Sequence, residues 1–133
     1  MTMQTTLIAG VSTPAEAPSW RLELTETVRL ALPIALTQLA SGLVVAAEGP
    51  DTVIAAPDGR LACAQRASSW LSVAGTGDVL AGAIASRLAT GLDPFDAACQ
   101  GVWLHSEAAR LAGPAFTAGA LARAVPEALA ACL

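Results

Sequence analysis

The chain has 133 residues, of which 54% are hydrophobic and only 14% are charged. This length favours one domain, and the composition excludes disorder along the whole chain, which requires low hydrophobicity and high charge. All seven basic residues are arginine, no two of them are adjacent, and the net charge is -4. These features argue against a nucleic-acid-binding surface, since such a surface needs clustered positive charge.

The first forty residues divide into a leader and a predicted helix. Thr, Ser, Pro and Ala dominate residues 11–20, which have no helical or strand period, so we expect the leader, residues 1–20, to be poorly ordered. Residues 21–38 are predicted to form a helix that Pro33 kinks or interrupts. The stretch from Leu30 to Ala47 is uncharged and has the minimum length of a membrane span, about 17–25 residues. Its polar residues and Pro33 weaken a membrane interpretation.

The next segment predicts short strands and a hairpin. Residues 42–47 and 52–55 are apolar strand candidates, and residues 60–63 follow the turn Pro57-Asp58-Gly59. Proline presets φ, the aspartate side chain can accept from its own backbone, and glycine tolerates positive φ. The sequence therefore predicts a hairpin over residues 52–63.

The second half predicts three helices. The first runs over residues 78–90 and ends at Gly91, and its near lack of charge predicts that most of its surface is buried. The second runs over residues 94–112, with Asp93 as its N-cap and Pro94 in the first helical position. The third follows the N-cap Thr117, runs to about residue 131, and is perturbed at Pro126.

The three cysteines, Cys63, Cys99 and Cys132, are far apart and form no C-x-x-C motif. Their odd number and spacing argue against a disulfide framework or a zinc site. We therefore expect the three cysteines to be small apolar residues of the core, in a protein of a reducing, cytoplasmic compartment.

The segment Gly75-Thr76-Gly77-Asp78 is the motif that carries chemistry. It opens a predicted helix, whose unpaired N–H groups and dipole favour an anion such as phosphate. Asp78 adds a carboxylate that can act as a general base or accept a hydrogen bond from a substrate hydroxyl. Taken alone, this pattern also suits an ordinary helix start with an acidic first turn.

A longer pattern places the motif in a family. The run from AGTGDVLAG through DPFDAA and GVWLHSEAA to VPEAL, together with EGPDTVIAAPDGR, resembles the C-terminal part of the ADP-dependent NAD(P)H-hydrate dehydratases. These are ribokinase-like enzymes that use ADP, or ATP in some members, to dehydrate the S epimer of hydrated NADH or NADPH. The resemblance covers residues 41–133 and leaves residues 1–40 as an unrelated, partly disordered leader and helix.

The resemblance implies roles for particular residues. Asp78 would be the catalytic residue and would contact the hydrated nicotinamide, and His105 would be a second substrate contact. The nucleotide would be ADP or ATP, with Mg2+ as a candidate metal ion. The nucleotide-binding residues would be Gly49, Thr52, Gly75, Thr76 and Gly77. No metal-ligating side chains are predicted.

Two departures from the family pattern bear on activity. The family's phosphate-loop lysine is replaced by Glu48, a carboxylate that would repel phosphate, and the chain has no lysine at all. A family domain is also normally about twice this length or more. The resemblance therefore implies an α/β fold class: part of a ribokinase-like domain, with a small sheet remnant carrying the 52–63 hairpin packed on C-terminal helices, plus the N-terminal helix.

The leading segment resembles a different family. WRLELTETVRLALPIALTQLA is similar to the start of a multidrug and toxin extrusion transporter, over about twenty residues.

Three hypotheses for function follow: a truncated dehydratase, a non-catalytic nucleotide-binding remnant of that fold, or a membrane-associated fragment. The truncation predicts a bare apolar sheet face, and so a homo-oligomer or a complementing chain.

Several other side chains have a structural explanation beside a functional one. His105 is the one histidine, and a partly buried helix position competes with its predicted contact role. Trp70 and Trp103 could stack on an adenine, although packing competes in a core so poor in aromatic residues. Glu107 is expected to be solvated, and Asp96 to be a helix-start residue like Asp93.

Overall fold

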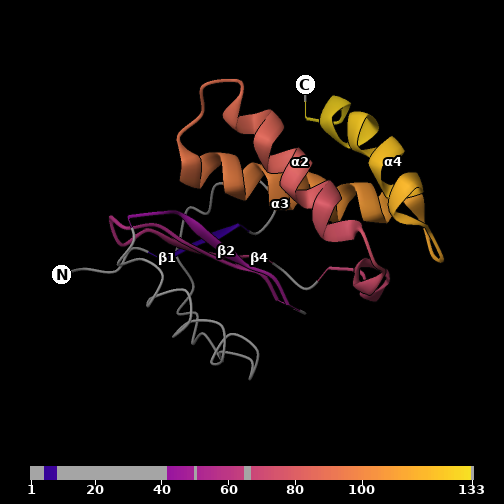
Figure 1. Ribbon diagram of the computed structural model, residues 1–133, viewed down its shortest axis with the longest axis horizontal. Helices are drawn as coiled ribbons and strands as arrows, with labels where there is room; N and C mark the ends of the chain where they lie inside the picture. The colour runs from indigo at the N-terminus through magenta and orange to yellow at the C-terminus, as the bar shows by residue number, and fades with distance from the viewer. Residues whose placement is uncertain (1–4, 9–41, 50, 65–66, 133) are drawn as a thin grey trace, which may run out of the picture. The chain divides into compact units, whose positions relative to one another are not determined.

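The computed structural model describes residues 5–8, 42–49, 51–64 and 67–132 (Figure 1). The chain divides into two compact units, Met1–Gln65 and Arg66–Leu133. The predicted helix over residues 21–38 and most of the uncharged stretch that begins at Leu30 lie outside the described residues. The transporter-like segment lies outside them as well.

The first unit contains a four-stranded mixed sheet. Its strands are β1 (Thr5–Ile8), β2 (Val45–Ala47), β3 (Val53–Ala55) and β4 (Leu61–Ala64), in the order β1-β4-β3-β2. Strand β1 pairs with β4 in parallel, whereas the β4–β3 and β3–β2 pairs are antiparallel. The three residues of β3 are all buried, as expected for a β-branched and apolar strand in the interior of a sheet.

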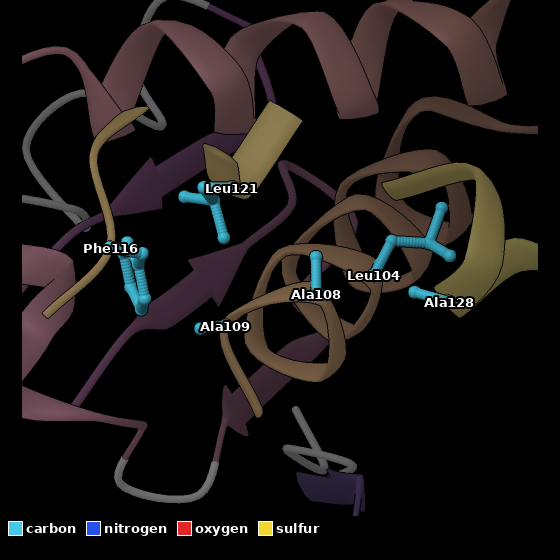
Figure 2. Close-up of a cluster of buried hydrophobic side chains, with 6 residues drawn as sticks. All are labelled: Leu104, Ala108, Ala109, Phe116, Leu121 and Ala128. Carbon is cyan, nitrogen blue, oxygen red and sulfur yellow. The ribbon is translucent and has the colours of Figure 1, made fainter. Parts of the chain in front are cut away.

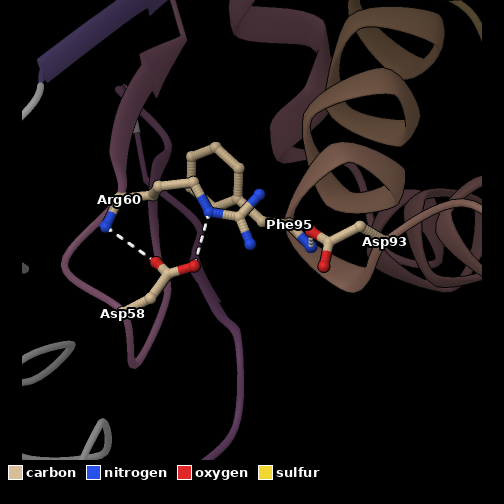
Figure 3. A network of polar contacts seen from close by, with 4 residues as sticks. All are labelled: Asp58, Arg60, Asp93 and Phe95. Carbon is tan, nitrogen blue, oxygen red and sulfur yellow. Dashed lines mark hydrogen bonds and ion pairs between the residues drawn. The ribbon is translucent and has the colours of Figure 1, made fainter.

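The predicted hairpin is confirmed, and its turn has the expected chemistry. Gly59 donates its N–H to Ala56 O at 3.0 Å and has φ +92°, while Ala56 N donates to Arg60 O at 2.9 Å. This is a tight turn followed by a left-handed glycine, a common hairpin connection. Asp58 Oδ1 accepts from Arg60 N at 3.0 Å, and Asp58 Oδ2 accepts from Arg60 Nε at 2.7 Å (Figure 3). The turn therefore fixes the register that pairs Ala55 with Leu61.

The second unit is helical. A short 3-10 helix, η2 (Ser69–Ser72), precedes α2 (Thr76–Leu88), α3 (Pro94–Ala112) and α4 (Ala118–Ala130). Helix α3 has the predicted bounds, and Asp93 Oδ1 caps it by accepting from Phe95 N at 3.0 Å (Figure 3). Helix α4 continues through Pro126, although proline has no N–H to donate within the helix.

The core of this unit lies between α3 and α4. Leu104, Ala108 and Ala109 come from α3, Leu121 and Ala128 from α4, and Phe116 from the connection between them (Figure 2). Leu121, Ala108 and Ala128 are fully buried. Since three of the six side chains are alanine, the helices must approach closely to exclude water.

Two expectations about burial were wrong. Most of α2 was expected to be buried, but its buried residues are Thr76, Leu80 and Ala83, because α3 and α4 pack on one side of it within this unit. The cysteines were expected in the core, but Cys63 and Cys99 are half-buried and Cys132 is exposed. Cys132 follows the end of α4 at Ala130, past the residues that pack on α3.

The described residues form an α/β fold, with strands in the first unit and helices in the second. Among the helices in these ranges, none combines the length and apolar character needed to cross a membrane.

Candidate functional site

The start of α2 differs from the starts of α3 and α4. Asp93 and Thr117 cap α3 and α4 with side-chain oxygens, Thr117 Oγ1 accepting from Ala120 N at 3.2 Å. The N-cap of α2 is Gly75, which has no side chain and makes no such bond. The first turn of α2 therefore keeps N–H groups that no capping side chain satisfies, and these suit an anionic ligand.

Gly75 is required at this position by two features of its geometry. Its φ of +88° lies in the left-handed region, where a side chain is strained. A Cβ on Gly75 would also lie 3.1 Å from Ala118 Cβ, at the beginning of α4. The glycine therefore allows the chain to turn sharply into α2 while α4 passes close by.

The side chains of the motif divide into one that is buried and one that faces solvent. Thr76 is 4% exposed, whereas Asp78 is exposed in the first turn of α2. An exposed carboxylate beside uncapped N–H groups can reach a bound ligand. Gly75, Gly77 and Asp78, three of the residues predicted for the site, therefore lie together at the start of α2.

Thr76 anchors the turn that leads into the motif. Its Oγ1 lies 2.6 Å from Leu71 O and 2.8 Å from Val73 O, and its N–H donates to Val73 O at 3.3 Å. The Thr76 side chain is thus directed into the protein, so its predicted part in nucleotide binding would fall to its backbone.

His105 reaches the same residue from α3. It is 6% exposed, and its Nε2 lies 2.9 Å from Thr76 O. A carbonyl oxygen only accepts, so Nε2 carries a proton. Thr76 and His105 were both predicted at the site, but the bond between them was not, since nothing in a sequence indicates that residues 29 positions apart are in contact.

The tight packing of α2 on α3 makes that bond possible. A Cβ at Gly101 would clash with Ile84 Cγ1 and would lie 2.8 Å from Ile84 Cα. Gly101 therefore lets the backbone of α3 approach α2 directly, four residues before His105.

The loop after β2 holds the remaining predicted positions. Glu48 and Gly49 are exposed, Thr52 is half-buried, and Pro50 lies outside the described residues. Thr52 O accepts from Ala64 N at 2.9 Å, which extends the β3–β4 pairing. The nearby Cys63 thiol has its pKa raised by burial and, to a smaller extent, by the negative charge of Asp51. The loop thus presents negative charge where the family pattern has a lysine.

The structure also distinguishes among the other candidate side chains. Trp103 packs against the core cluster, which favours its structural role, whereas Trp70 is 44% exposed in η2. Glu107 forms an ion pair with Arg110 on the surface of α3, at 2.6 Å and 2.8 Å. Among the residues that the structure describes, no group of three or more His, Cys, Asp and Glu side chains could hold a metal ion.

Comparisons with known sequences agree on one family. The family model described as NAD(P)H-hydrate dehydratase matches residues 25–130. An ADP-dependent (S)-NAD(P)H-hydrate dehydratase of Neisseria meningitidis is 44% identical over 68 residues, which are 51% of this chain and 23% of that protein. A protein of the same name from Xanthomonas campestris is 42% identical over 84 residues, 62% of this chain and 29% of that protein. The chain therefore matches less than a third of the length of each relative.

A solved structure gives the same result. The ADP/ATP-dependent NAD(P)H-hydrate dehydratase of Bacillus subtilis, co-crystallised with ATP and Mg2+ and soaked with coenzyme A, superposes with a TM-score of 0.70 at 28% sequence identity. The match covers 77% of this chain and 40% of that chain. The likeness thus extends from the sequence motifs to the fold.

Proposed function

The chain belongs to the NAD(P)H-hydrate dehydratase family, and from this premise we propose that it acts in the ADP-dependent dehydration of (S)-NAD(P)H-hydrate. In this reaction, hydrolysis of the nucleotide drives the loss of water from the hydrated nicotinamide ring. The relatives named for this activity are more than three times as long as the matched segment. The dehydratase activity is therefore a proposal that rests on membership of the family.

The observation that carries the proposal is the uncapped start of α2. Gly75 has no side chain and adopts a left-handed conformation, so the backbone of Gly75, Thr76 and Gly77 can approach phosphate oxygens closely. We assign the nucleotide phosphates to this turn. Asp78, exposed in the same turn, is assigned to the hydrated nicotinamide, where its carboxylate would accept a proton or a hydrogen bond from the ring hydroxyl.

The nucleotide would be ADP or ATP, in keeping with the ADP/ATP-dependent relative of known structure. Mg2+ would accompany the nucleotide, bound to its phosphates. Gly49 and Thr52, in the loop after β2, are proposed as further nucleotide contacts. The proposed compartment is the cytoplasm.

A second candidate function is nucleotide binding without turnover, and Glu48 favours it. An exposed carboxylate in place of the family lysine would weaken the attraction for phosphate.

Calorimetric titration of the full chain with ADP tests the proposal. We expect measurable heat and a rise in the melting temperature at millimolar ADP. The absence of both would contradict nucleotide binding by this chain.

An assay of hydrated NADH turnover distinguishes the dehydratase from a protein that binds nucleotide without turnover. The assay monitors the near-ultraviolet absorbance of NADH, which returns as the hydrate is dehydrated. Asp78→Asn should abolish turnover and leave ADP binding intact. Asp96→Asn is the matched control, since Asp96 is also an exposed carboxylate in the first turn of a helix. ADP binding by the unsubstituted chain without turnover would favour the non-catalytic function.

A further inference from the structure

His105 lies too deep to be an evident substrate contact, yet it is bound to the motif. It is more than nine-tenths buried on α3, and its Nε2 lies 2.9 Å from Thr76 O. Buried polar groups generally require such a partner. What this bond does depends on the peptide unit that it holds.

The carbonyl that His105 binds belongs to the same peptide unit as the N–H of Gly77. A peptide unit is planar and trans, so its C=O and N–H point in opposite directions. A bond that fixes the direction of Thr76 O therefore also fixes the direction of the Gly77 N–H. Donation to the carbonyl also polarises the peptide and strengthens its N–H as a donor.

This peptide unit needs such a restraint because of its neighbours. Gly75 and Gly77 flank Thr76, and glycine resists peptide rotation less than any other residue. Thr76 Oγ1 holds the preceding backbone at Leu71 O and Val73 O, and Thr76 O lies in the hydrogen-bond ladder of α2, of which Thr76 is the first residue. The bond from His105 adds a second restraint on this carbonyl, from another helix, in the terminal turn where helices fray.

We propose that His105 is a positioning residue, which aims the Gly77 N–H at the nucleotide through Thr76 O. The proposal rests on the proposed function for its ligand, although the orientation of the peptide can be measured without one. His105 would thus act through the backbone of the motif, whereas the sequence predicts that it contacts the substrate directly.

The first test uses nitrogen-15 NMR of the full chain. His105 should be protonated on Nε2, and in doubly labelled protein this nitrogen should show a hydrogen-bond coupling to the carbonyl carbon of Thr76. Protonation on Nδ1 alone would overturn the proposal, and this measurement needs no variant and no ligand.

The second test compares His105→Leu with His105→Gln, whose side-chain amide can replace the Nε2 donor. In His105→Leu, the Gly77 amide should shift and exchange its hydrogen faster than the amides of the α3–α4 core. His105→Gln should restore both toward the values of the unsubstituted chain. Leu104→Ala is the control, because Leu104 neighbours His105 and lies in the core cluster, so its loss should raise exchange generally without singling out Gly77.

ADP titration of the same variants completes the test. His105→Leu should weaken ADP binding about tenfold, the effect of losing one well-placed hydrogen bond, and His105→Gln should weaken it less. If the unsubstituted chain fails to bind ADP, the proposed function fails while the Gly77 amide still decides the role of His105. An unchanged Gly77 amide in His105→Leu would overturn the positioning role whatever the result with ADP.

Discussion

Two side chains at the start of α2 differ in exposure, and we propose different roles for them. Thr76 holds the backbone, and Asp78 is proposed to contact a ligand. The Thr76 side chain is buried and bonded to Leu71 O and Val73 O, while Asp78 in the same turn is exposed. Glycines on both sides of Thr76 leave the backbone accessible. The turn is thus held by one buried side chain while the Asp78 side chain stays exposed.

Glu48 provides a prediction about charge. If the loop after β2 faces phosphate, Glu48→Lys replaces repulsion with attraction and should tighten ADP binding by on the order of tenfold. The gain should shrink as salt is added. Calorimetry at two ionic strengths measures it, and Glu48→Gln should give an intermediate affinity. Equal affinity in all three chains would remove this loop from the nucleotide site.

The ion pair on α3 provides a prediction about pH. The hydrogen bond from Arg110 lowers the pKa of the Glu107 carboxyl below its usual range. A carboxyl with a lowered folded-state pKa stabilises the fold above its unfolded-state pKa, and this is lost as the pH falls through the folded value. Glu107→Gln should therefore lower the melting temperature slightly at neutral pH, with a difference that shrinks below about pH 4.3.

Removing the other partner of the pair checks this interpretation. Arg110→Gln should give the same dependence on pH, because it abolishes the same hydrogen bonds. A difference that persists undiminished at low pH would show that helix propensity or packing, rather than the ion pair, causes the effect.

At the scale of secondary-structure elements, α2 and α3 pack with their backbones close together. Helices α2 and α3 meet where Gly101 faces Ile84, and a Cβ there would come within 2.9 Å of Ile84 N as well as the other Ile84 atoms. Two of those three atoms belong to the backbone, so neither can move aside by changing rotamer. The distance between these helices is therefore set by the absence of a side chain.

Gly101→Ala should consequently be destabilising. We expect the melting temperature to fall, with a loss of about 1–3 kcal/mol in the free energy of unfolding, because overpacking forces the helices apart. Gly82→Ala is a matched control inside α2, since nothing lies within 4 Å of a Cβ at Gly82. It should stabilise by about 0.5–1 kcal/mol through helix propensity. Equal effects would contradict close packing at Gly101.

At the scale of the whole molecule, apolar surface remains exposed. Leu43, which precedes β2 at one end of the described sheet, is 64% exposed, and Leu88 at the end of α2 is 43% exposed. An edge strand offers backbone groups for pairing, and apolar side chains beside it favour association. The oligomer expected from the sequence stays a prediction.

We therefore predict that the purified chain self-associates through the β2 edge. Sedimentation velocity should show an average mass that rises with concentration, and Leu43→Arg should reduce that rise. Leu88→Arg, at the other exposed leucine, should leave it largely unchanged. One monomeric species over the micromolar range would contradict the prediction.

The local features of the fold were predictable because they depend on neighbouring residues. The Pro57-Asp58-Gly59 turn and the caps at Asp93 and Thr117 were all predicted, and each is formed by hydrogen bonds spanning two or three residues. The first residue of α2 was placed two residues late, because Gly75 caps the helix through its conformation and not through a side chain. The catalytic role of Asp78, which the motif and the family resemblance indicate, stays a prediction.

By itself, the sequence determined the α/β class, the hairpin, the order of the helices and the family, because turns, caps and motifs are encoded in contiguous residues. The tertiary structure decided which side of α2 is covered, that Gly101 must lack a Cβ, and that His105 binds Thr76 O. These features depend on contacts between helices, and a side chain has no local signal for a partner that only the packing of α2 on α3 brings within reach.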